Sequence, residues 1–533
     1  MRKIITAYND GGGWSHYHNI DVKGYAFDSK GNMLSGVSLA SAIASAQTVE
    51  ELAELALSLN GLYCAAGISP VGAFALVDKV RSIPLFYAPS FTSVLFSDNP
   101  YIFQQSNELN SNSVLEFQSA GHCLGDKTLL NGVKQVEAST LVIFSNSVWQ
   151  KVAYFSYATQ YERKQTYDDA KQKLRLVLDN CMHRMVKSIA NRHIAVPLSG
   201  GYDSRFIVAW LTLNGYKNFT TFTYGRSGNS EMLMAQRVSE TLGCQWLPIV
   251  YTDAMIKSIA SDDFFEPYVR FASTACSMPF FQDYPAVNSM VKGNALPKGT
   301  VVILGHSGDT LAGSWLRSDY KNMPKDKIAD AIIHNFHRFI NLSKSEKNSL
   351  HNIANDFVAS LHNCLPYSVM DWWNMRERQA KFIVNSCRAY SFFDFDFRLP
   401  LFDDELIDFF KFLPFSYKLH KKLYNETLEE YYFKPLGLTY TNDLQLTRRD
   451  YILRQAKGMI KKTFPILDKF RRPFTDNICY AEIASQLYNQ YGLSIDEERI
   501  RNPKSLNAPI ANWYLTVLSQ KLPNWYCLER NNT

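Results

Sequence analysis

No apolar run in the sequence approaches the roughly 20 residues that a helix needs to cross a bilayer. The densest apolar stretch runs from Phe206 to Leu213 and is long enough for one buried helix. The basic start of the chain is followed by the glycine-rich segment 9–13 and not by an apolar core, so we expect no signal peptide. These absences predict a cytoplasmic protein without a membrane partner.

The nine cysteines form no C-x-x-C pair and are odd in number, which favours free thiols in a reducing compartment over a zinc site. A strong charge excess is also missing, because 56 Lys and Arg residues against 50 Asp and Glu residues leave a net charge of +6. Spread over 533 residues, this charge predicts no nucleic-acid partner. A nucleotide or an acidic small molecule needs only a local positive site.

Residues 1–160 have the pattern of a β-rich domain. Short apolar runs of four to six residues lie between Gly, Ser, Asn and Asp turns, as is typical of strands. The clearest runs are 72–77, 93–96 and 140–144, and a helix is expected over 48–59 with Thr48 as its N-cap. We predict a domain boundary near residue 160.

Residues 161–533 begin with a charged helix, predicted over 167–189, and continue as an alternation of strands and helices. This alternation argues for a parallel sheet with crossover helices, and from about residue 325 the apolar period is helical. The expected fold class is therefore α/β, with a β-rich sandwich followed by a parallel-sheet domain that ends in a helical part. The predicted strands are 194–198, 219–224 and 246–250, and the predicted helices between them are 203–213 and 231–242.

The most informative segment, S-G-G-Y-D-S-R, starts at Ser199, directly after the predicted strand. Gly200 and Gly201 allow positive φ and a close approach of backbone to a ligand. The helix that follows points its free N–H groups at the turn, and the hydroxyls of Ser199 and Ser204 add donors. Such a turn can bind an anion, whereas a plain strand–helix turn with a capping residue is the alternative interpretation.

Asp203 places a carboxylate beside this turn, where a phosphate would repel it. The repulsion disappears if Asp203 holds a Mg²⁺ ion that bridges to phosphate oxygens. The segment has no G-K-[ST] and is therefore not a Walker-type phosphate loop.

The S-G-G-Y-D-S segment resembles the pyrophosphate loop of ATP pyrophosphatases, which split ATP into AMP and pyrophosphate, and within that group the chain resembles the asparagine synthetase family. Three further segments resemble family motifs in the family's order. They are T-Y-G at 223–225 with E-M-L-M-A at 231–235, G-H-S-G-D-T-L-A-G at 305–313, and F-R-L-P-L-F-D at 397–403.

The resemblance implies a nucleotide site at the carboxyl ends of the parallel strands. By the matched positions, Leu198 and Tyr224 lie against adenine and ribose, and Asp203 and Asp309 bind Mg²⁺. The residues implied to bind ATP are Leu198, Ser199, Gly200, Gly201, Asp203, Ser204, Tyr224 and Gly305.

Three positions depart from the family pattern. His306 stands where relatives usually carry glutamate; it could accept a proton from an incoming amine, with Glu377 on a predicted helix 372–384 orienting its ring, or it could only shape the loop. Arg205 replaces a small residue and could touch a phosphate or an anionic substrate, or be a solvated helix residue. Thr310 replaces a second glutamate.

The N-terminal part resembles the family's partner domain, an N-terminal-nucleophile glutaminase, at 59–63, 78–87 and 128–133. That glutaminase needs a cysteine at position 2, where this chain has Arg2, and its N-G-E loop is absent too. The first cysteine, Cys64, lies in a predicted strand and is expected to be structural. We therefore expect a degenerate glutaminase-like domain over 1–160.

Together these features predict an ATP-dependent amide-bond-forming ligase that works through an acyl-adenylate, without its own glutaminase. A small carboxylate is its expected substrate, and ammonia, an amine or a separate ammonia-supplying protein its nitrogen source. The chain resembles asparagine-synthase-related proteins of surface-polysaccharide clusters, which implies amidation of a sugar acid. The alternatives are a natural-product ligase that closes β-lactams or peptides and a non-catalytic nucleotide-binding scaffold.

Overall fold

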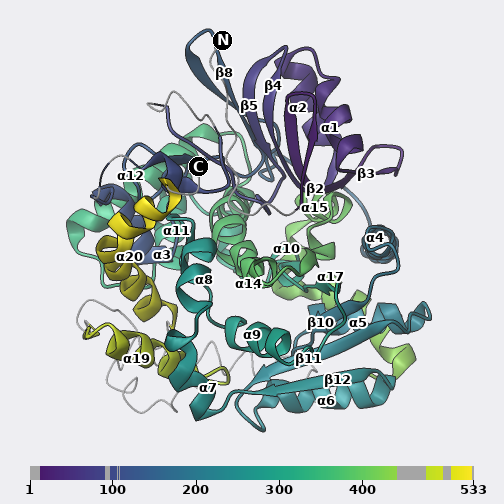
Figure 1. The fold of residues 1–533 in the computed structure, drawn as a ribbon. Coiled ribbons are helices and arrows are strands. Elements are labelled where there is room, and N and C mark those ends of the chain that lie inside the picture. Colours follow the sequence, from purple (N-terminus) through teal and green to yellow (C-terminus); the bar gives the residue numbers. More distant parts are fainter. Residues whose placement is uncertain are drawn as a thin grey trace.

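The computed structural model describes residues 13–89, 96–104, 106, 108–440, 476–495 and 506–530 (Figure 1). Its first part is an antiparallel sheet with the strand order β1-β2-β4-β5-β8-β9 and β3 paired to β2. The strands are β1 (Trp14–Tyr17), β2 (Ile20–Phe27), β3 (Met33–Ser35), β4 (Asn60–Ser69), β5 (Gly72–Val77), β8 (Thr140–Ser145) and β9 (Val148–Ala153). The runs predicted at 72–77 and 140–144 are therefore confirmed as strands, whereas 93–95 lie outside the described residues.

Different layers cover the two faces of this sheet. Helices α1 (Val37–Ala44) and α2 (Val49–Ser58) pack on one face, and Thr48 caps α2 by accepting from the Glu51 N–H at 3.1 Å, as predicted. The other face packs against the short pair β6 (Phe86–Tyr87) and β7 (Lys134–Gln135) and the residues around it, so in the described part of the chain the second sheet of the expected sandwich is small.

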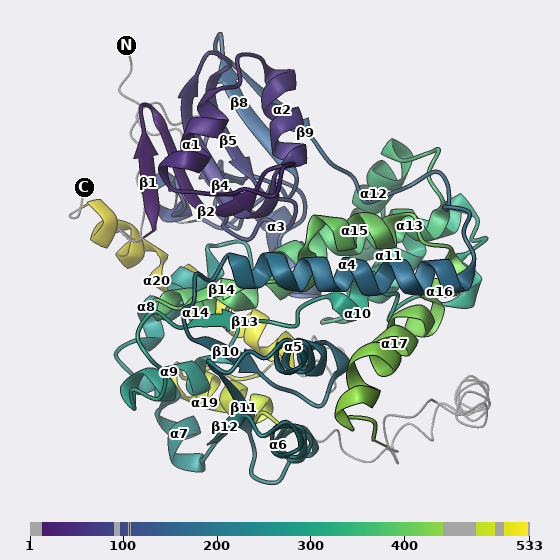
Figure 2. The ribbon, with the colours of Figure 1, turned by 90° about the vertical axis from the view of Figure 1, so that its right-hand side faces the viewer.

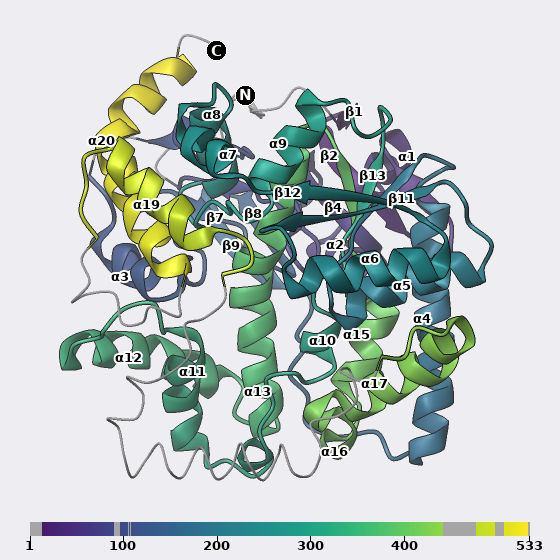
Figure 3. The same cartoon turned by 90° about the horizontal axis from the view of Figure 1, so that it is seen from below.

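The second part is a parallel five-stranded sheet, which confirms the predicted α/β class. Its order is β12-β11-β10-β13-β14, and each neighbouring pair is parallel. Helix α5 packs on β10, and α6 packs on β11 and β12 (Figure 3). The bounds are β10 (Ile194–Pro197), β11 (Phe219–Gly225), β12 (Gln245–Val250), β13 (Val301–Ile303), β14 (Asp396–Arg398), α5 (Tyr202–Leu213) and α6 (Ser230–Leu242).

The charged helix predicted near the boundary is α4 (Tyr167–Lys187), which lies between the two sheets (Figure 2). The later part of the chain is helical, as expected. Its helices are α7 (Asp253–Ser258), α8 (Phe265–Ser273), α9 (Tyr284–Lys292), α10 (Gly308–Leu311), α11 (Ile328–Phe336), α12 (Lys344–Ser360), α13 (Pro366–Trp373), α14 (Arg388–Phe392), α15 (Asp404–Lys411), α16 (Phe415–Lys418), α17 (Lys422–Leu428), α19 (Tyr480–Gln490) and α20 (Asn507–Arg530), with α3 (Ser111–Ala120) in the first part.

The long helix predicted over 372–384 changes its winding along its length. After α13 the chain continues as a π-helix, Asn374–Ile383, followed by a 3₁₀ turn, Val384–Cys387. A π-helix advances the hydrogen bond to the fifth residue and so changes which side chains share a face. In the part of the chain that the structure describes, no helix combines the length and apolarity required to cross a membrane.

Candidate active site

The turn between β10 and α5 is held closed by two serine hydroxyls. The Ser199 N–H donates to Ser204 Oγ at 3.1 Å, and the two Oγ atoms are also 3.1 Å apart. The Gly201 N–H donates to Ser199 Oγ at 3.2 Å, and no side chain caps the first turn of α5. The turn therefore has a fixed shape at the carboxyl end of the parallel sheet, where the sequence placed it.

The two glycines of this turn do not serve the purpose that the sequence suggested. Gly201 has φ −78° and ψ 171°, an extended conformation, and Gly200 is not among the residues with positive φ. A Cβ atom on Gly200 would meet Met234 Cβ at 3.7 Å, an ordinary contact. The expectation of positive φ at these two glycines was therefore wrong.

Close backbone approach is required at two other glycines, in the loop after β13. A Cβ atom on Gly305 would lie 2.9 Å from the Ser204 N atom, and one on Gly308 would lie 2.6 Å from Leu401 Cδ1 and 2.7 Å from the Tyr424 hydroxyl. The loop 305–309 is therefore pressed against the start of α5. This contact brings two segments together that are about a hundred residues apart in the sequence.

Asp203 and Asp309 meet at this contact, as the sequence predicted. Asp203 Oδ2 accepts from the Asp309 N–H at 3.0 Å, and Oδ1 accepts from the Tyr424 hydroxyl at 2.9 Å. Burial and the neighbouring Asp309 charge raise the pKa of Asp203 to about 7. Two neighbouring acids that are both half-buried fit a cation, and Mg²⁺ typically takes one or two carboxylates together with phosphate oxygens and water.

The residues expected near adenine and ribose lie beside the turn. Leu198 is buried, with 1% of its surface exposed, and its N–H donates to the Phe222 carbonyl. Tyr224 is half-buried at the end of β11, its hydroxyl donates to Asp283, and its ring stacks on Tyr251 with 5.7 Å between centroids. The hydroxyl of Tyr224 is therefore already engaged by Asp283, and Leu198 offers little surface to a ligand.

Arg205 differs from both interpretations of the sequence. Its side chain is buried, and its guanidinium donates to the Gly200 carbonyl at 2.9 Å. The rings of Tyr202, Phe433 and Tyr440 surround it at 5.2–5.4 Å. Arg205 is thus neither a solvated helix residue nor directed at a phosphate. Its guanidinium lies inside the fold and supports the turn through the Gly200 carbonyl.

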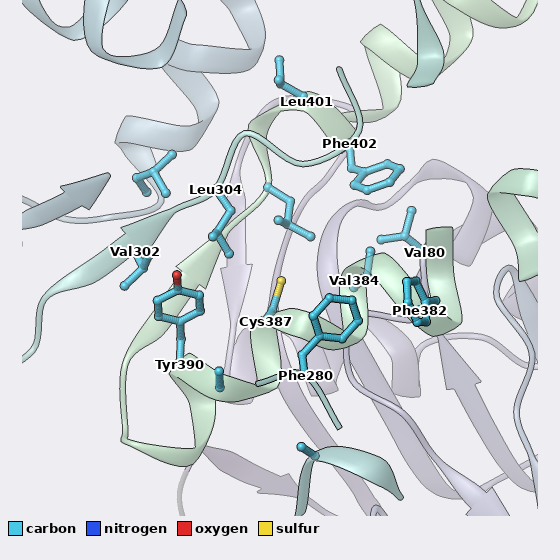
Figure 4. Packing of buried hydrophobic residues seen from close by; sticks show 14 of the residues in the cluster. Val80, Phe280, Val302, Leu304, Phe382, Val384, Cys387, Tyr390, Leu401 and Phe402 are labelled. Atoms are coloured by element: carbon cyan, nitrogen blue, oxygen red, sulfur yellow. The ribbon is translucent and has the colours of Figure 1, made fainter. Parts of the chain in front are cut away.

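His306 lies at the start of the loop 305–309 and is half-buried. Its Nδ1 is 3.6 Å from Cys387 Sγ, a hydrogen-bonding distance for sulfur, and burial lowers the pKa of His306 to about 4. Cys387 itself lies among the apolar side chains of the core, with Leu304 and Phe280 near it (Figure 4). The imidazole is therefore neutral at pH 7 and is oriented by a thiol.

The predicted partner of His306, Glu377, points elsewhere, and that prediction was wrong. Glu377 is buried, pairs with Lys381 Nζ at 2.5 Å and accepts from the Gly125 N–H at 3.2 Å. Glu377 was assigned to His306 by positional analogy alone, and in the structure its carboxylate is instead held by Lys381 and the Gly125 N–H. A different residue of the π-helix, Gln379, contacts the loop 305–309. Its Oε1 accepts a hydrogen bond from Ser307 Oγ at 2.5 Å.

A pocket of about 620 Å³ opens beside His306 and Asp309. Its walls come from the loop after β13, from α11 and the residues that follow it, and from the π-helix. The sequence did not predict this pocket or the role of Tyr424, because neither belongs to a local motif. The lining includes Gly305, His306, Ser307, Asp309, Thr310, Ser314, Trp315, Asn335, Phe336, Arg338, Asn374, Arg378, Gln379 and Ile383.

The comparison with known families agrees with this geometry. Residues 173–434 match the family model described as Asparagine synthase. These residues form an asparagine synthase domain. The match covers just under half of the chain and contains the whole candidate site, from Leu198 to Tyr424. A search of curated proteins finds no match.

An asparagine synthase domain implies an ATP-dependent amide ligase, so the coarser part of the predicted function is confirmed, and ATP is the nucleotide that this family uses. The match begins inside α4, after the predicted boundary. The boundary near residue 160, the glutaminase-like ancestry of 1–160 and the individual site residues therefore stay predictions.

Proposed function

We propose that the protein joins a carboxylate to a nitrogen nucleophile in two steps. First, a carboxylate oxygen bonds to the α-phosphorus of ATP, the bond from that phosphorus to the bridging oxygen breaks, and pyrophosphate leaves. Second, the nitrogen attacks the carbonyl carbon, the bond from that carbon to the AMP oxygen breaks, and the nitrogen loses a proton. The meeting of Asp203 with Asp309 beside the turn 199–201 is the observation that carries this proposal.

The turn and the start of α5 would bind the pyrophosphate part of ATP through backbone N–H groups and the hydroxyls of Ser199 and Ser204. Asp203 and Asp309 would hold Mg²⁺, which supplies positive charge to offset that of pyrophosphate. Tyr424 and the Asp309 N–H each donate to one Asp203 oxygen and so fix the plane of the carboxylate. Preorganised charge of this kind costs no rearrangement during the reaction.

His306 is the residue that we assign to the second step. Its Nδ1 faces Cys387, which leaves Nε2 for a group in the pocket that the ring lines. Because the imidazole is neutral at pH 7, it can accept a hydrogen bond, and then a proton, from the attacking nitrogen.

We further propose a sugar acid as the acyl substrate and a nitrogen donor that comes from outside the chain. Trp315 and Phe336 give the pocket an aromatic surface, and Asn335 and Asn374 give it amide groups, a combination suited to a polyhydroxylated ring. Arg2, outside the described residues, stands where a glutaminase of this family carries its cysteine. Ammonia, an amine or a separate ammonia-supplying protein would then provide the nitrogen.

The test is product analysis with purified protein, ATP, Mg²⁺, ammonium and a set of uronic acids. We expect AMP and pyrophosphate to form in equal amounts, and only when a suitable acid is present. Formation of ADP and phosphate would contradict the proposed chemistry. Tight ATP binding without any turnover, across acids and amines, would favour the non-catalytic scaffold instead.

A further inference from the structure

One wall of the pocket beside Asp309 carries a cation to which the described residues offer no hydrogen-bond acceptor. Arg378 lies on the π-helix and lines the pocket, half-buried. In the part of the chain that the structure describes, its guanidinium makes no hydrogen bond or ion pair; its contacts are the Phe382 ring at 5.9 Å and the field of Asp309. Burial lowers the pKa of Arg378, so the charged group has lost water without gaining an acceptor.

A second cation stands at the outer part of the same pocket. Arg338 follows α11, is exposed, and likewise makes no hydrogen bond or ion pair to the described residues. Asp309 is the single acidic residue in the described lining. Once Asp309 holds Mg²⁺, the two guanidiniums have no counter-charge in the described walls.

The loop wall and the π-helix wall of this pocket would therefore bind different groups. The loop wall contains His306 and Asp309 and contacts the start of α5, so the carboxylate to be activated would lie there. Arg378 belongs to the π-helix wall, together with the amide side chains of Asn374 and Gln379, whereas Asp203 is not part of the lining of this pocket. An arginine fork of this kind matches the oxygen pair of a carboxylate or a phosphate.

We propose that the acyl substrate carries a second anionic group, a phosphate or a carboxylate, which Arg378 binds while Arg338 attracts it at the mouth of the pocket. This inference rests on the proposed function, since it assigns the pocket to the acyl substrate. For a sugar acid it means a sugar that bears a further phosphate or acid group. Arg378 is then a specificity residue and takes no part in the bond changes.

The test measures binding by titration calorimetry, with Mg²⁺ and a non-hydrolysable ATP analogue present. Two matched pairs of probes differ mainly in the second anion: glucuronate 1-phosphate against glucuronate, and succinate against succinamate. We expect the doubly charged member of at least one pair to bind about tenfold more tightly or better, the factor expected for a charged hydrogen-bonded contact. The phosphate and carboxylate pairs separate the two sources of the anion.

Variants then assign the preference to its residue. Arg378→Gln should remove the difference within a pair, Arg378→Lys should restore part of it, and the exposed control Arg317→Gln, which pairs with Asp319 outside the pocket, should leave it intact. Equal binding of both members, or no binding of any probe, overturns the inference. A weaker affinity of Arg378→Gln for the ATP analogue itself would also overturn it, by assigning the guanidinium to the nucleotide phosphates.

The calorimetric result is independent of turnover. If the doubly charged probes bind tightly only when Arg378 is present, but no AMP forms with any acid, the anion site is supported and the proposed ligase chemistry is contradicted. If AMP forms equally well with both members of each pair, the ligase stands and the anion site fails.

Discussion

At the residue scale, the position of Asp203 beside Asp309 is unfavourable for stability, which is typical of a ligand-binding site. An acid that has lost part of its water and lies next to a second acid is costly, and the pKa of Asp203 is raised to about 7 for these two reasons. A fold without a ligand in this place would avoid such a pair. The sequence predicted both acids from two local motifs, but it could not predict that the Tyr424 hydroxyl completes the arrangement, because α17 follows more than two hundred residues later.

Removing one acid separates metal binding from folding. Asp309→Asn keeps the N–H that donates to Asp203 and removes the charge that repels it, so we expect an unchanged or higher Tm without ligand. The rise in Tm that Mg²⁺ and ATP cause should be lost, and AMP formation should fall by about 100-fold or more. Scanning calorimetry with and without Mg-ATP measures both Tm values. A rise in the Tm of Asp309→Asn as large as that of the wild type on addition of Mg-ATP would disprove the metal assignment.

Cys387 gives a second prediction at this scale. Because its sulfur orients the His306 ring, Cys387→Ala should slow amide formation by about tenfold, whereas Cys387→Ser, which keeps a hydrogen-bonding group, should slow it less. ATP–pyrophosphate exchange without a nitrogen donor should stay near the wild-type rate in both. The buried Cys64→Ala in β4 is the matched control. An equal loss in both steps would mean that Cys387 only packs.

His306→Ala is the corresponding test of the base itself. General-base loss typically costs about 10²–10⁴-fold in rate, and we expect that loss in amide formation and not in exchange. If both steps fall together, His306 shapes the phosphate loop; if neither changes, the histidine is structural.

At the scale of elements, the local sequence predicted the regular strands but not the π-helix. Strands β10, β11 and β12 and the turn at 199–201 were predicted because apolar runs and glycines mark them directly. The π-helix Asn374–Ile383 was predicted as a regular helix, since a period of 3.6 residues is the only helical period that sequence patterns display well. Glu377, which was assigned to His306 by positional analogy alone, instead contacts Lys381 and the Gly125 N–H.

We therefore expect the Glu377–Lys381 pair to contribute to stability and not to catalysis. Lys381 is fully buried and also donates to the carbonyls of Gly125 at 2.6 Å and Cys123 at 3.3 Å. Lys381→Met leaves the Glu377 charge buried, with Arg376 as the remaining cation beside it among the described residues, and we expect a loss of about 3 kcal/mol in the free energy of unfolding.

The double variant Glu377→Gln with Lys381→Met should recover part of that loss, which urea denaturation can measure. The rate of AMP formation per folded molecule of Glu377→Gln should stay close to wild type. A large fall in rate with unchanged stability would restore Glu377 to the catalytic residues.

At the scale of the whole molecule, glutamine chemistry is expected to be missing. Cys64, the first cysteine of the sequence, is buried in β4, and burial raises the pKa of its thiol well above the usual range, so this thiol is unsuited to act as a nucleophile. Incubation with glutamine, with or without ATP, should release no ammonia above a protein-free blank. Glutamate formation by pure protein would disprove this.

The sequence predicted two domains, but a continuous core runs across the expected boundary. The Leu129 N–H donates to the Ala275 carbonyl at 2.7 Å, and the Met278 N–H donates to the Gly121 carbonyl at 2.8 Å. Helix α20, near the end of the chain, packs on α3 of the first part, with Phe117 and Tyr514 ring centroids 5.5 Å apart. Such contacts cannot be inferred from composition or periodicity, because they join segments hundreds of residues apart.

This continuity predicts that the first part is retained as a support for the pocket even without glutaminase activity. A variant that starts at residue 161 would lose the Gly125 and Cys123 carbonyls that satisfy buried Lys381, and it would expose the core residues that α3 covers. We expect it to be insoluble, or to bind ANS and lack the near-ultraviolet circular dichroism of the full chain. A soluble 161–533 fragment with a cooperative urea transition and wild-type affinity for Mg-ATP would show that the first part does not support the site.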